Sequence, residues 1–278
     1  MKFTKMQGCG NDYIYVNCFE QTVADPKNTS IRLSDRHFGI GGDGLVLISP
    51  SETADFDMDM YNADGSRSGM CGNAIRCVGK YVYDRGLTDK KVITVSTQTG
   101  VKTLWLDVRG GAVQTVRVCM GEPDFRPEAV PVSGEGETFL RQTIDVLGEP
   151  WEVSAVSVGN PHCVTYVADP YALDFPRIGP AFENHPVFPK RTNTEFVQIL
   201  DRKTLKMRVW ERGSGETFAC GTGASAVHAV TAKLGLCDDA VLIHLRGGDL
   251  QIEWDRETNL LYMTGPAKFV FDGEVEIP

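Results

Sequence analysis

Two cysteines in matching contexts are the residues of this chain best placed to do chemistry. Cys71 and Cys220 are each followed by glycine and by an apolar helical pattern, over residues 72–85 and 222–234. The first turn of a helix has free backbone N–H groups and a partial positive charge. A thiol there forms thiolate more readily, which makes it a base or a nucleophile. The same N–H groups can bind a carboxylate.

A thiol pair beside a carboxylate site suits inversion of the carbon next to that carboxylate. One thiolate removes the α-proton from one face, and the opposing thiol delivers a proton to the other face. The N–H groups of the helix ends stabilise the enediolate that forms between the two steps. Acyl transfer by a single cysteine would instead require a paired histidine base. The pattern therefore favours a two-base epimerase or racemase that requires no cofactor.

The two cysteines lie in two similar halves of the chain. Residues 56–61 and 205–210 alternate apolar and polar side chains, which predicts half-buried strands, and they start 149 residues apart. The same offset relates Gly10-Asn11 to Gly159-Asn160, Cys71-Gly72 to Cys220-Gly221, Gly86-Leu87 to Gly235-Leu236, Val92 to Val241 and Trp105 to Trp254. So many matches at one offset indicate an internal duplication into two similar domains.

Each half is predicted to consist mainly of strands around one helix. Further strands are expected at residues 91–96 and 104–108 in the first half, and at 241–245 and 250–254 in the second. Both helical patterns are apolar over much of their circumference, and helices of this kind are usually buried. The expected fold class is α+β: two pseudo-symmetric domains, each a mixed β-sheet or barrel wrapped around a central buried helix.

The domain boundaries follow from the duplication. The first domain is expected over residues 1–120 and the second over residues 121–265. The tail, residues 266–278, is expected to pack on the first domain. Residues 122–150 are rich in Pro, Glu and Gly and have no counterpart in the first half, so the linker is placed there.

Composition narrows the classes of function. The 278 residues are 42% hydrophobic and 23% charged, as in an ordinary globular protein. A net charge of −9 argues against nucleic-acid binding. No apolar run is long enough to cross a membrane, and residues 1–5 lack the apolar core of a signal peptide. The eight cysteines include no C-x-x-C pair, so no metal site is expected. A soluble, cytoplasmic protein is predicted.

The blocks around these cysteines resemble those of diaminopimelate epimerases. In chain order they are Gly8–Asp12, Asn62–Ser66, Met70–Cys77, Gly159–His162, Arg191–Phe196, Glu211–Gly213 and Thr217–Gly223. The resemblance extends from residue 2 to about residue 265. It implies a cofactor-independent enzyme, with the diaminopimelate epimerase-like fold, that interconverts LL-2,6- and meso-diaminopimelate in lysine and peptidoglycan precursor biosynthesis. Such enzymes are typically homodimers.

The resemblance also implies a role for each matching residue. Cys71 and Cys220 would be the catalytic acid/base pair, and His162 and Glu211 would help to set the protonation of the thiols. The substrate would be bound by Asn11, Asn62, Gly72, Asn73, Asn160, Asn193, Glu211, Arg212, Gly221 and Thr222. A guanidinium such as that of Arg212 can grip a carboxylate with two parallel hydrogen bonds. The chain departs from the family at Gly44, where many members carry Gln, so that side-chain contact is either absent here or supplied by a neighbouring residue.

Three alternatives stay open on the sequence alone. A proline or hydroxyproline racemase would share the motif at Cys220, but its first motif usually has His at the position of Asn73, and it lacks the block at residues 211–213 in this form. A thiol redox protein could cycle Cys71 and Cys220 through a disulfide, although no redox partner motif is present. In a non-catalytic binding protein the two thiols would have no role.

Other signals are interpreted as structural. Residues 39–44 fit G-x-G-x-x-G, but residues 45–48 read as a strand where a dinucleotide site requires a helix. His37, His185, His228 and His244 lack metal-ligand spacing. The remaining cysteines are expected to be buried or incidental, namely Cys9, Cys18, Cys77, Cys119, Cys163 and Cys237.

Overall fold

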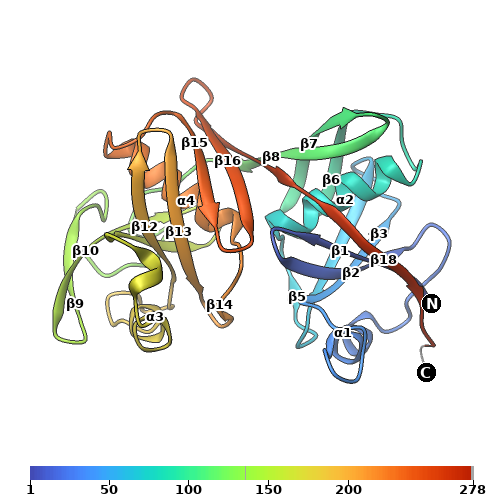
Figure 1. Cartoon of the computed structure of the whole chain (residues 1–278), viewed down its shortest axis with the longest axis horizontal. Coiled ribbons are helices and arrows are strands. Elements are labelled where there is room, and N and C mark those ends of the chain that lie inside the picture. The colour runs from blue at the N-terminus through green and yellow to red at the C-terminus, as the bar shows by residue number, and fades with distance from the viewer. Residues whose placement is uncertain (135, 277–278) are drawn as a thin grey trace. The chain divides into compact units, whose positions relative to one another are not determined.

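The chain forms two compact units (Figure 1). The computed structural model describes residues 1–134 and 136–276. Unit 1 comprises Met1–Val118 and Thr264–Pro278, and unit 2 comprises Cys119–Met263. Of the tail assigned to the first domain, residues 277–278 lie outside the described part. None of the helices in that part is long and apolar enough to cross a membrane.

Unit 1 is built from strands and two helices. Its elements are β1 (Lys2–Gly8), β2 (Asn11–Asn17), α1 (Pro26–Ser34), β3 (Gly44–Ser49), β4 (Phe56–Asn62), β5 (Arg67–Ser68), α2 (Gly72–Asp84), β6 (Val92–Thr97), β7 (Gly100–Arg109), β8 (Ala112–Gly121) and β18 (Lys268–Glu274). The end of β8 extends past the boundary at Val118. The strand β3 replaces the helix that a dinucleotide site would need after residue 44.

Unit 2 begins with an additional strand and then, apart from a short 3-10 helix, repeats the order from β1 to β8. Its elements are β9 (Gln142–Val146), β10 (Glu149–Ser157), β11 (Pro161–Tyr166), η1 (Pro170–Ala172), α3 (Phe175–Glu183), β12 (Asn193–Asp201), β13 (Thr204–Glu211), β14 (Gly215–Glu216), α4 (Gly221–Lys233), β15 (Ala240–Leu245), β16 (Gly248–Asp255) and β17 (Leu260–Pro266). The last residues of β17 belong to unit 1. The sequence patterns predicted neither α1 nor α3, both of which are short.

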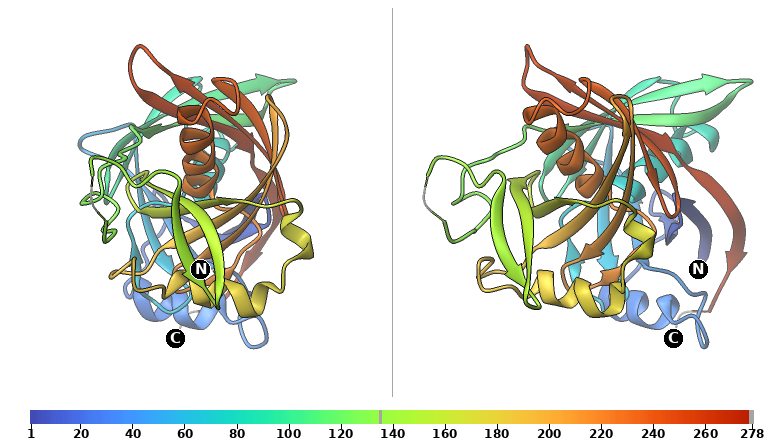
Figure 2. Two further views of the ribbon diagram at one scale, coloured as in Figure 1. Left: turned by 90° about the vertical axis from the view of Figure 1, so that its left-hand side faces the viewer. Right: turned by 60° about the vertical axis from the view of Figure 1, so that its left-hand side comes forward.

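The two helices that follow the cysteines are buried, as predicted. In α2 the apolar side chains of Ile75, Val78 and Val82 are fully inaccessible to solvent, and nearly all of α4 is buried. Figure 2 shows α4 lying against the strands of its own unit. A helix that is apolar on most sides is stable only when strands cover it. The fold class is therefore α+β with a mixed sheet around a central helix in each unit.

Strand pairing reproduces the duplication up to these helices. Within unit 1, β2 and β3 run parallel with Tyr13 opposite Gly44, and β3 pairs antiparallel with β4. Within unit 2, β11 and β12 run parallel with His162 opposite Asn193, and β12 pairs antiparallel with β13. Because both members of each pair are 149 residues apart, side chains at this offset occupy equivalent positions.

Beyond the helices the expectation of one unbroken offset was wrong. Val92 pairs with Trp105 in unit 1, whereas Ala240 pairs with Glu253 in unit 2, so the offset there is 148. The segment between helix and strand is one residue shorter in unit 2. A shift of one residue turns every side chain of a strand to the opposite face. Trp254 is accordingly buried, while Trp105 is only partly buried.

The placement of a linker at residues 122–150 was also wrong. Val130, Val132 and Phe139 from this stretch are buried in the core of unit 2 with Phe188. The strand β9 also lies within it and pairs with β10. Widely spaced apolar residues can anchor a chain segment even where Pro and Gly interrupt regular structure, because each buried side chain contributes about 1.5–3 kcal/mol.

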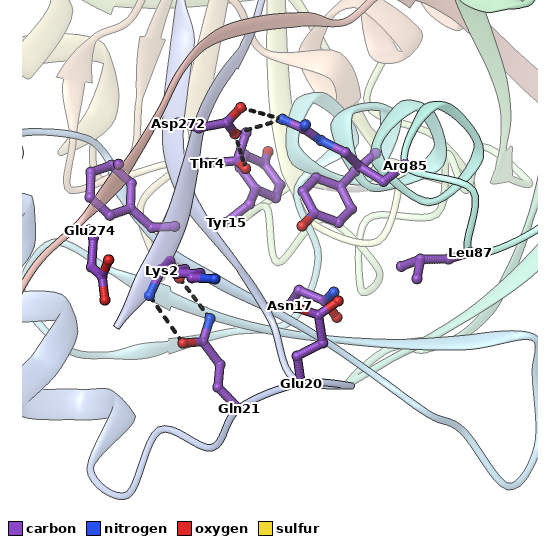
Figure 3. Close-up of a pocket in the computed structure, with 13 residues that line it drawn as sticks. Lys2, Thr4, Tyr15, Asn17, Glu20, Gln21, Arg85, Leu87, Asp272 and Glu274 are labelled. Carbon is purple, nitrogen blue, oxygen red and sulfur yellow. Dashed lines mark hydrogen bonds and ion pairs between the residues drawn. The ribbon is translucent and has the colours of Figure 1, made fainter.

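The C-terminal strand completes unit 1. β18 pairs antiparallel with β1, which begins the chain. Figure 3 shows Asp272 of β18 facing Arg85 and Thr4, with Arg85 at 2.6 Å and the Thr4 hydroxyl donating at 2.6 Å. These residues line a pocket of about 480 Å³ in unit 1, and Cys71 is not part of its lining.

Candidate active site

Cys71 and Cys220 are the residues immediately before α2 and α4. Cys71 has φ −126° and ψ 120°, and Cys220 has φ −122° and ψ 114°. These extended angles are typical of a residue that caps a helix N-terminus. The two cysteines therefore have the same backbone position at the start of their helices, although only the Cys220 sulfur accepts a hydrogen bond from a first-turn N–H group. Each unit thus supplies a thiol beside a helix end able to bind an anion.

An oriented amide contacts the thiol of unit 1. The Cys71 thiol donates to Asn11 Oδ1 at 3.2 Å. Asn11 Nδ2 in turn donates to Asp43 Oδ2 at 2.6 Å, and Asp43 pairs with Arg36 at 3.0 Å. Since Asp43 can only accept from the amide N–H₂ group, it turns the amide oxygen toward the sulfur. Sequence analysis chose Asn11 but missed Asp43.

A second carboxylate strengthens this network. Asp12 pairs with Lys5 at 2.7 Å and with Arg36 at 2.7 Å. Burial raises the pKa of Asp12, but hydrogen bonds from Arg36 and Lys5 outweigh burial and leave that pKa below its usual value. For Asp43, burial prevails and the pKa is raised. Asp12 lies within the motif block Gly8–Asp12, but its partners, Lys5 and Arg36, lie outside that block.

A buried arginine supports the first turn of α2 and was also missed. The Arg76 side chain is fully buried. It donates to the carbonyl of Gly72 at 3.0 Å and to that of Pro266 at 3.2 Å. Its guanidinium also lies 3.7 Å from the Cys9 sulfur. Its sequence signals were its place in the motif block Met70–Cys77 and its position inside an apolar helical pattern.

The thiol of unit 2 has a different environment. Cys220 is only 6% exposed, and its sulfur accepts a hydrogen bond from the backbone N–H of Gly223 at 3.3 Å. The hydroxyl of Thr222 lies 3.4 Å from the same sulfur. Burial raises the pKa of Cys220 well above its usual value, and the charges of Glu211 and Glu195 raise it further. This thiol is therefore protonated at neutral pH in the structure.

Glu211 lies beside this thiol. The hydroxyl of Thr217 donates to Glu211 Oε1 at 2.5 Å. Burial raises the pKa of Glu211, while hydrogen bonds from Thr217 and Cys220 and the positive charge of His162 lower it in part. The structure thus brings together Cys220, Glu211 and His162, three of the four residues to which sequence analysis gave a catalytic role.

His162 is held by two acceptors. Its Nδ1 lies 2.7 Å from Glu195 Oε1, and its Nε2 lies 2.9 Å from Asn160 Oδ1. His162 and Glu195 are both completely buried. Sequence analysis gave no role to Glu195, although it lies within the motif at residues 191–196.

The predicted substrate-binding residues of unit 2 differ in their freedom to reach a ligand. Both ends of the Asn193 amide contact the protein: Nδ2 donates to the Pro161 carbonyl at 2.7 Å, and Oδ1 accepts from the Arg212 N–H at 2.9 Å. The Arg212 side chain is exposed and donates to the Lys190 carbonyl at 3.2 Å. Asn193 therefore positions the backbone of Arg212, whose guanidinium can reach a ligand.

The remaining candidates of unit 1 lie on β4 and α2. Asn62 ends β4, and its Nδ2 donates to the Ser66 hydroxyl at 2.9 Å. Asn73 is buried in the first turn of α2. At Gly44 an added Cβ would overlap the carbonyl oxygen of Tyr61, so no side chain fits there without a backbone shift. Asn193 occupies the equivalent position in unit 2.

Residues interpreted as structural behave differently from the two capping cysteines. Burial raises the pKa of Cys77, inside α2, to about 11. Burial lowers the pKa of His228, inside α4, to about 4, and its Nε2 contacts the Asp238 carbonyl at 3.1 Å. Both side chains are therefore neutral at physiological pH.

Solved structures of low sequence identity share this fold. The chain is similar to a phenazine biosynthesis protein of the PhzF family from Bacillus anthracis, with a TM-score of 0.73, 18% identity, and coverage of 100% of this chain and 99% of that one. It is also similar to a hydroxyproline epimerase from Agrobacterium vitis, with a TM-score of 0.70, 14% identity, and coverage of 99% and 90%. These likenesses define the fold class.

The sequence comparisons define the family. The family model for diaminopimelate epimerase matches residues 3–126 and 154–270. A diaminopimelate epimerase from Acetivibrio thermocellus is 56% identical, over 100% of this chain and 99% of that protein. One from Methanococcus maripaludis strain C5 is 51% identical over all of both chains. The chain belongs to the diaminopimelate epimerase family, which places it among the amino-acid epimerases and confirms the resemblance seen in its motifs.

Proposed function

We propose that this chain interconverts LL- and meso-2,6-diaminopimelate with Cys71 and Cys220 as its two bases, without a cofactor. The observation that carries the proposal is the equivalence of the two cysteines. Each caps a buried helix with the same backbone angles, in a chain of this family. Inversion of a carbon centre needs one proton removed from one face and another added to the opposite face, and two equivalent thiols supply both.

The carboxylate of the reacting centre binds at the helix ends. The backbone N–H groups of Gly72 and Asn73 in one half, and of Gly221 and Thr222 in the other, donate to it. As the α-proton leaves, negative charge develops on the carboxylate oxygens of the enediolate. Donors already aimed at those oxygens lower the barrier, because they need no rearrangement during the reaction.

The distal end of the substrate is recognised and not changed. It carries an ammonium and a carboxylate. Arg212 binds the carboxylate, supported by its exposure and by the Asn193 contact that holds its backbone. Asn11, Asn62, Asn160 and Glu211 provide further polar contacts. This binding scheme uses several polar residues of both halves. A substrate with a single charged centre would not need so many polar contacts.

Glu211 and His162 set the protonation of the second thiol. Glu211 accepts a hydrogen bond from Cys220, and its negative charge raises the pKa of that thiol. Cys220 therefore acts as the acid when Cys71 is the base. Cys71, which donates to Asn11 in the structure, must lose that proton before it removes the α-proton. The roles exchange in the reverse reaction.

We also infer the setting of the reaction from the family. The domains are residues 1–120 with the tail 266–278, and residues 121–265. The enzyme is a homodimer in the cytoplasm, acts in lysine and peptidoglycan precursor synthesis, and contacts neither nucleic acid nor membrane. Sedimentation should show a species of twice the chain mass of 30.5 kDa.

Proton exchange in heavy water tests the proposed reaction. Incubation with LL-diaminopimelate should produce the meso isomer with deuterium at the inverted α-carbon, as followed by NMR. Proline and hydroxyproline should show no α-exchange, which separates this enzyme from the racemase alternative. A redox protein or a binding protein would leave the α-hydrogens of diaminopimelate in place, and that result would reject the proposal.

A further inference from the structure

A buried ion pair lies next to the second thiol. His162 Nδ1 contacts Glu195 Oε1 at 2.7 Å, and neither side chain is accessible to solvent. The other ring nitrogen, Nε2, faces Asn160 Oδ1 at 2.9 Å. With an oxygen acceptor placed on each side of the ring, both nitrogens donate when the ring carries its second proton. Glu195 is then the counter-ion of the imidazolium.

Glu195 also packs against the helix end that Cys220 caps. A Cβ at Gly223 would lie only 2.7 Å from Glu195 Oε1, so glycine is needed there for the carboxylate to approach. The N–H of the same Gly223 donates to the Cys220 sulfur. The second oxygen of Glu195, Oε2, is buried and accepts no hydrogen bond within the described part of the chain. This carboxylate thus lies beside the turn that holds the thiol.

The other half of the molecule shows that the fold does not need this ion pair. The positions equivalent to His162 and Glu195 are Tyr13 and Val46, at the same strand register. Both are buried, and Val46 is fully inaccessible to solvent. A tyrosine and an aliphatic side chain therefore fill the same space in unit 1 without a charge.

Burying two charges is costly, and an apolar pair of similar volume is often equally stable or more stable. The ion pair in unit 2 is therefore not explained by stability. Its effect reaches the thiol through Glu211, because the positive charge of His162 lowers the pKa of Glu211. An ionised Glu211 is the form that accepts a hydrogen bond from the Cys220 thiol.

We infer that Glu195 is a positioning residue for epimerisation: it fixes His162 as an imidazolium, which keeps Glu211 ionised as the acceptor for the Cys220 thiol. The inference rests on the proposed function, in which Cys220 exchanges protons with the substrate. When Cys220 acts as the acid, its S–H bond breaks, the proton moves to the α-carbon, and the electron pair stays on sulfur. The imidazolium offsets the negative charge that then forms near two carboxylates.

Glu195→Gln in the full-length enzyme is the first test. We expect kcat to fall at least tenfold, as when a carboxylate that orients a catalytic histidine is lost. KM should change little, because the buried Glu195 does not reach the substrate. Glu216→Gln is the matched control: it removes a partly buried carboxylate of the same unit, which pairs with Arg208 at 2.7 Å, and should keep parental epimerisation.

The pH dependence separates positioning from a merely structural role. The titratable groups around His162 are Glu195, Glu211, Cys163 and Cys220. Without Glu195 the charged form of the ring loses its counter-ion. The deficit of Glu195→Gln should therefore shrink as the pH is lowered from 8 to 6. A deficit that is the same at every pH, with a lowered melting temperature, would overturn the inference.

A double variant keeps the test valid if the single variant folds poorly. His162→Tyr with Glu195→Val copies the residues that unit 1 has at these positions. We expect it to fold with a melting temperature near that of the parent and to lose epimerisation at least tenfold. Parental activity in this variant would overturn the inference.

Cys220→Ala distinguishes failure of this inference from failure of the proposed function. If Cys220→Ala is active, the two-thiol mechanism is wrong whatever Glu195 does. If Cys220→Ala is inactive while Glu195→Gln has parental kcat at every pH, only the role of Glu195 is wrong.

Discussion

Cys71 and Cys220 occupy the same backbone position in their units, but the groups around them differ in charge. Cys71 donates to the neutral amide of Asn11, which Asp43 orients from behind. Cys220 accepts from a backbone N–H and has the carboxylates of Glu211 and Glu195 near it. The position equivalent to Glu211 in unit 1 is the neutral Asn62.

This difference shows what each level of the molecule contributes. The duplicated backbone provides two thiols, each beside a helix end that can bind an anion. Divergence of a few buried side chains then gives the thiols different surroundings, a neutral amide beside Cys71 and two carboxylates near Cys220. In each turnover of a two-base enzyme one thiol holds a proton while the other lacks one, and the two exchange these states.

The central helices differ in the same manner. His228 of α4 occupies the position of Gly79 in α2. A Cβ at Gly79 would lie 3.0 Å from the side chains of Leu104 and Leu106, so that helix packs closely on β7. In unit 2 the equivalent space holds an imidazole that contacts the Asp238 carbonyl. The same helix position therefore accommodates either a glycine, as at Gly79, or a buried imidazole, as at His228.

The largest effect should come from removing either thiol. Cys71→Ala and Cys220→Ala should each lower epimerisation by roughly 10²–10⁴-fold, the usual contribution of a positioned acid or base. Cys77→Ala is the control inside α2: it should reduce the melting temperature and leave kcat close to the parental value. If one of the two capping cysteines could be replaced with more than a tenth of the activity retained, the halves would not share the reaction.

Loss of Arg212 should have the next largest effect. Arg212→Met removes the only group proposed here to bind the distal carboxylate, and kcat/KM should fall by about 10²-fold because substrate orientation is lost. The control is Arg202→Met, an exposed arginine paired with Asp238 at 2.8 Å, which should be nearly neutral. Steady-state kinetics checks both. Normal turnover by Arg212→Met would mean that another residue recognises the distal end.

Substitutions at Glu211 and at its equivalent in unit 1, Asn62, should change how readily the two thiols are alkylated. The charge of Glu211 raises the pKa of Cys220, so Glu211→Gln lowers it and alkylation of Cys220 should begin at lower pH. A shift of one pKa unit corresponds to about a tenfold change in thiolate at fixed pH. Asn62→Glu, the reciprocal change, should slow alkylation of Cys71.

Mass-mapped alkylation with iodoacetamide measures both thiols in one sample. The thiol of the unaltered half is the internal reference in each variant. Unchanged alkylation of Cys220 in Glu211→Gln would show that the charge of Glu211 does not set its proton affinity.

The smallest effect concerns stability in acid. Burial lowers the pKa of His228 from 6.5 to about 4 in the folded state. Below pH 6.5 the unfolded chain therefore binds a proton that the folded chain does not, and stability falls as the pH drops from 6.5 towards 4, by roughly 3 kcal/mol in all. His228→Gln should lose less stability than the parent between pH 7 and pH 5.

Melting temperatures at the two pH values test this. The exposed His244 gives the control, and His244→Gln should lose as much stability as the parent on acidification. An equal loss in His228→Gln would exclude His228 as a source of the acid sensitivity. Epimerisation at pH 8 should be near parental in both variants, since neither residue lies in the proposed site.

Several features of this protein follow from the sequence by itself. The expected helices at residues 72–85 and 222–234 are Gly72–Asp84 and Gly221–Lys233 in the structure. The start of each helix is specified by residues that are close together in the sequence, namely a cysteine, a glycine and an apolar pattern. It can therefore be predicted without knowledge of tertiary contacts. The motif blocks were also sufficient to identify the family.

Other features depend on segments that are distant in the chain. The shift of one residue beyond the helices is visible only in strand pairing, because Val92 matches Val241 better than Ala240 by residue type. The core position of residues 130–139 likewise depends on α3 and the segment after it. Short motifs carry no information about which distant strand or helix will cover them.

The site shows the same division. The sequence determined the two thiols, the glycines after them and the polar residues of the motifs. Only the tertiary structure decided that Asp43 orients Asn11, that Arg76 of α2 donates to the Pro266 carbonyl, and that Glu195 pairs with His162. The physical reason is that the charge state of a buried group depends on its desolvation and on partners a few ångströms away, and folding brings those partners from separate strands.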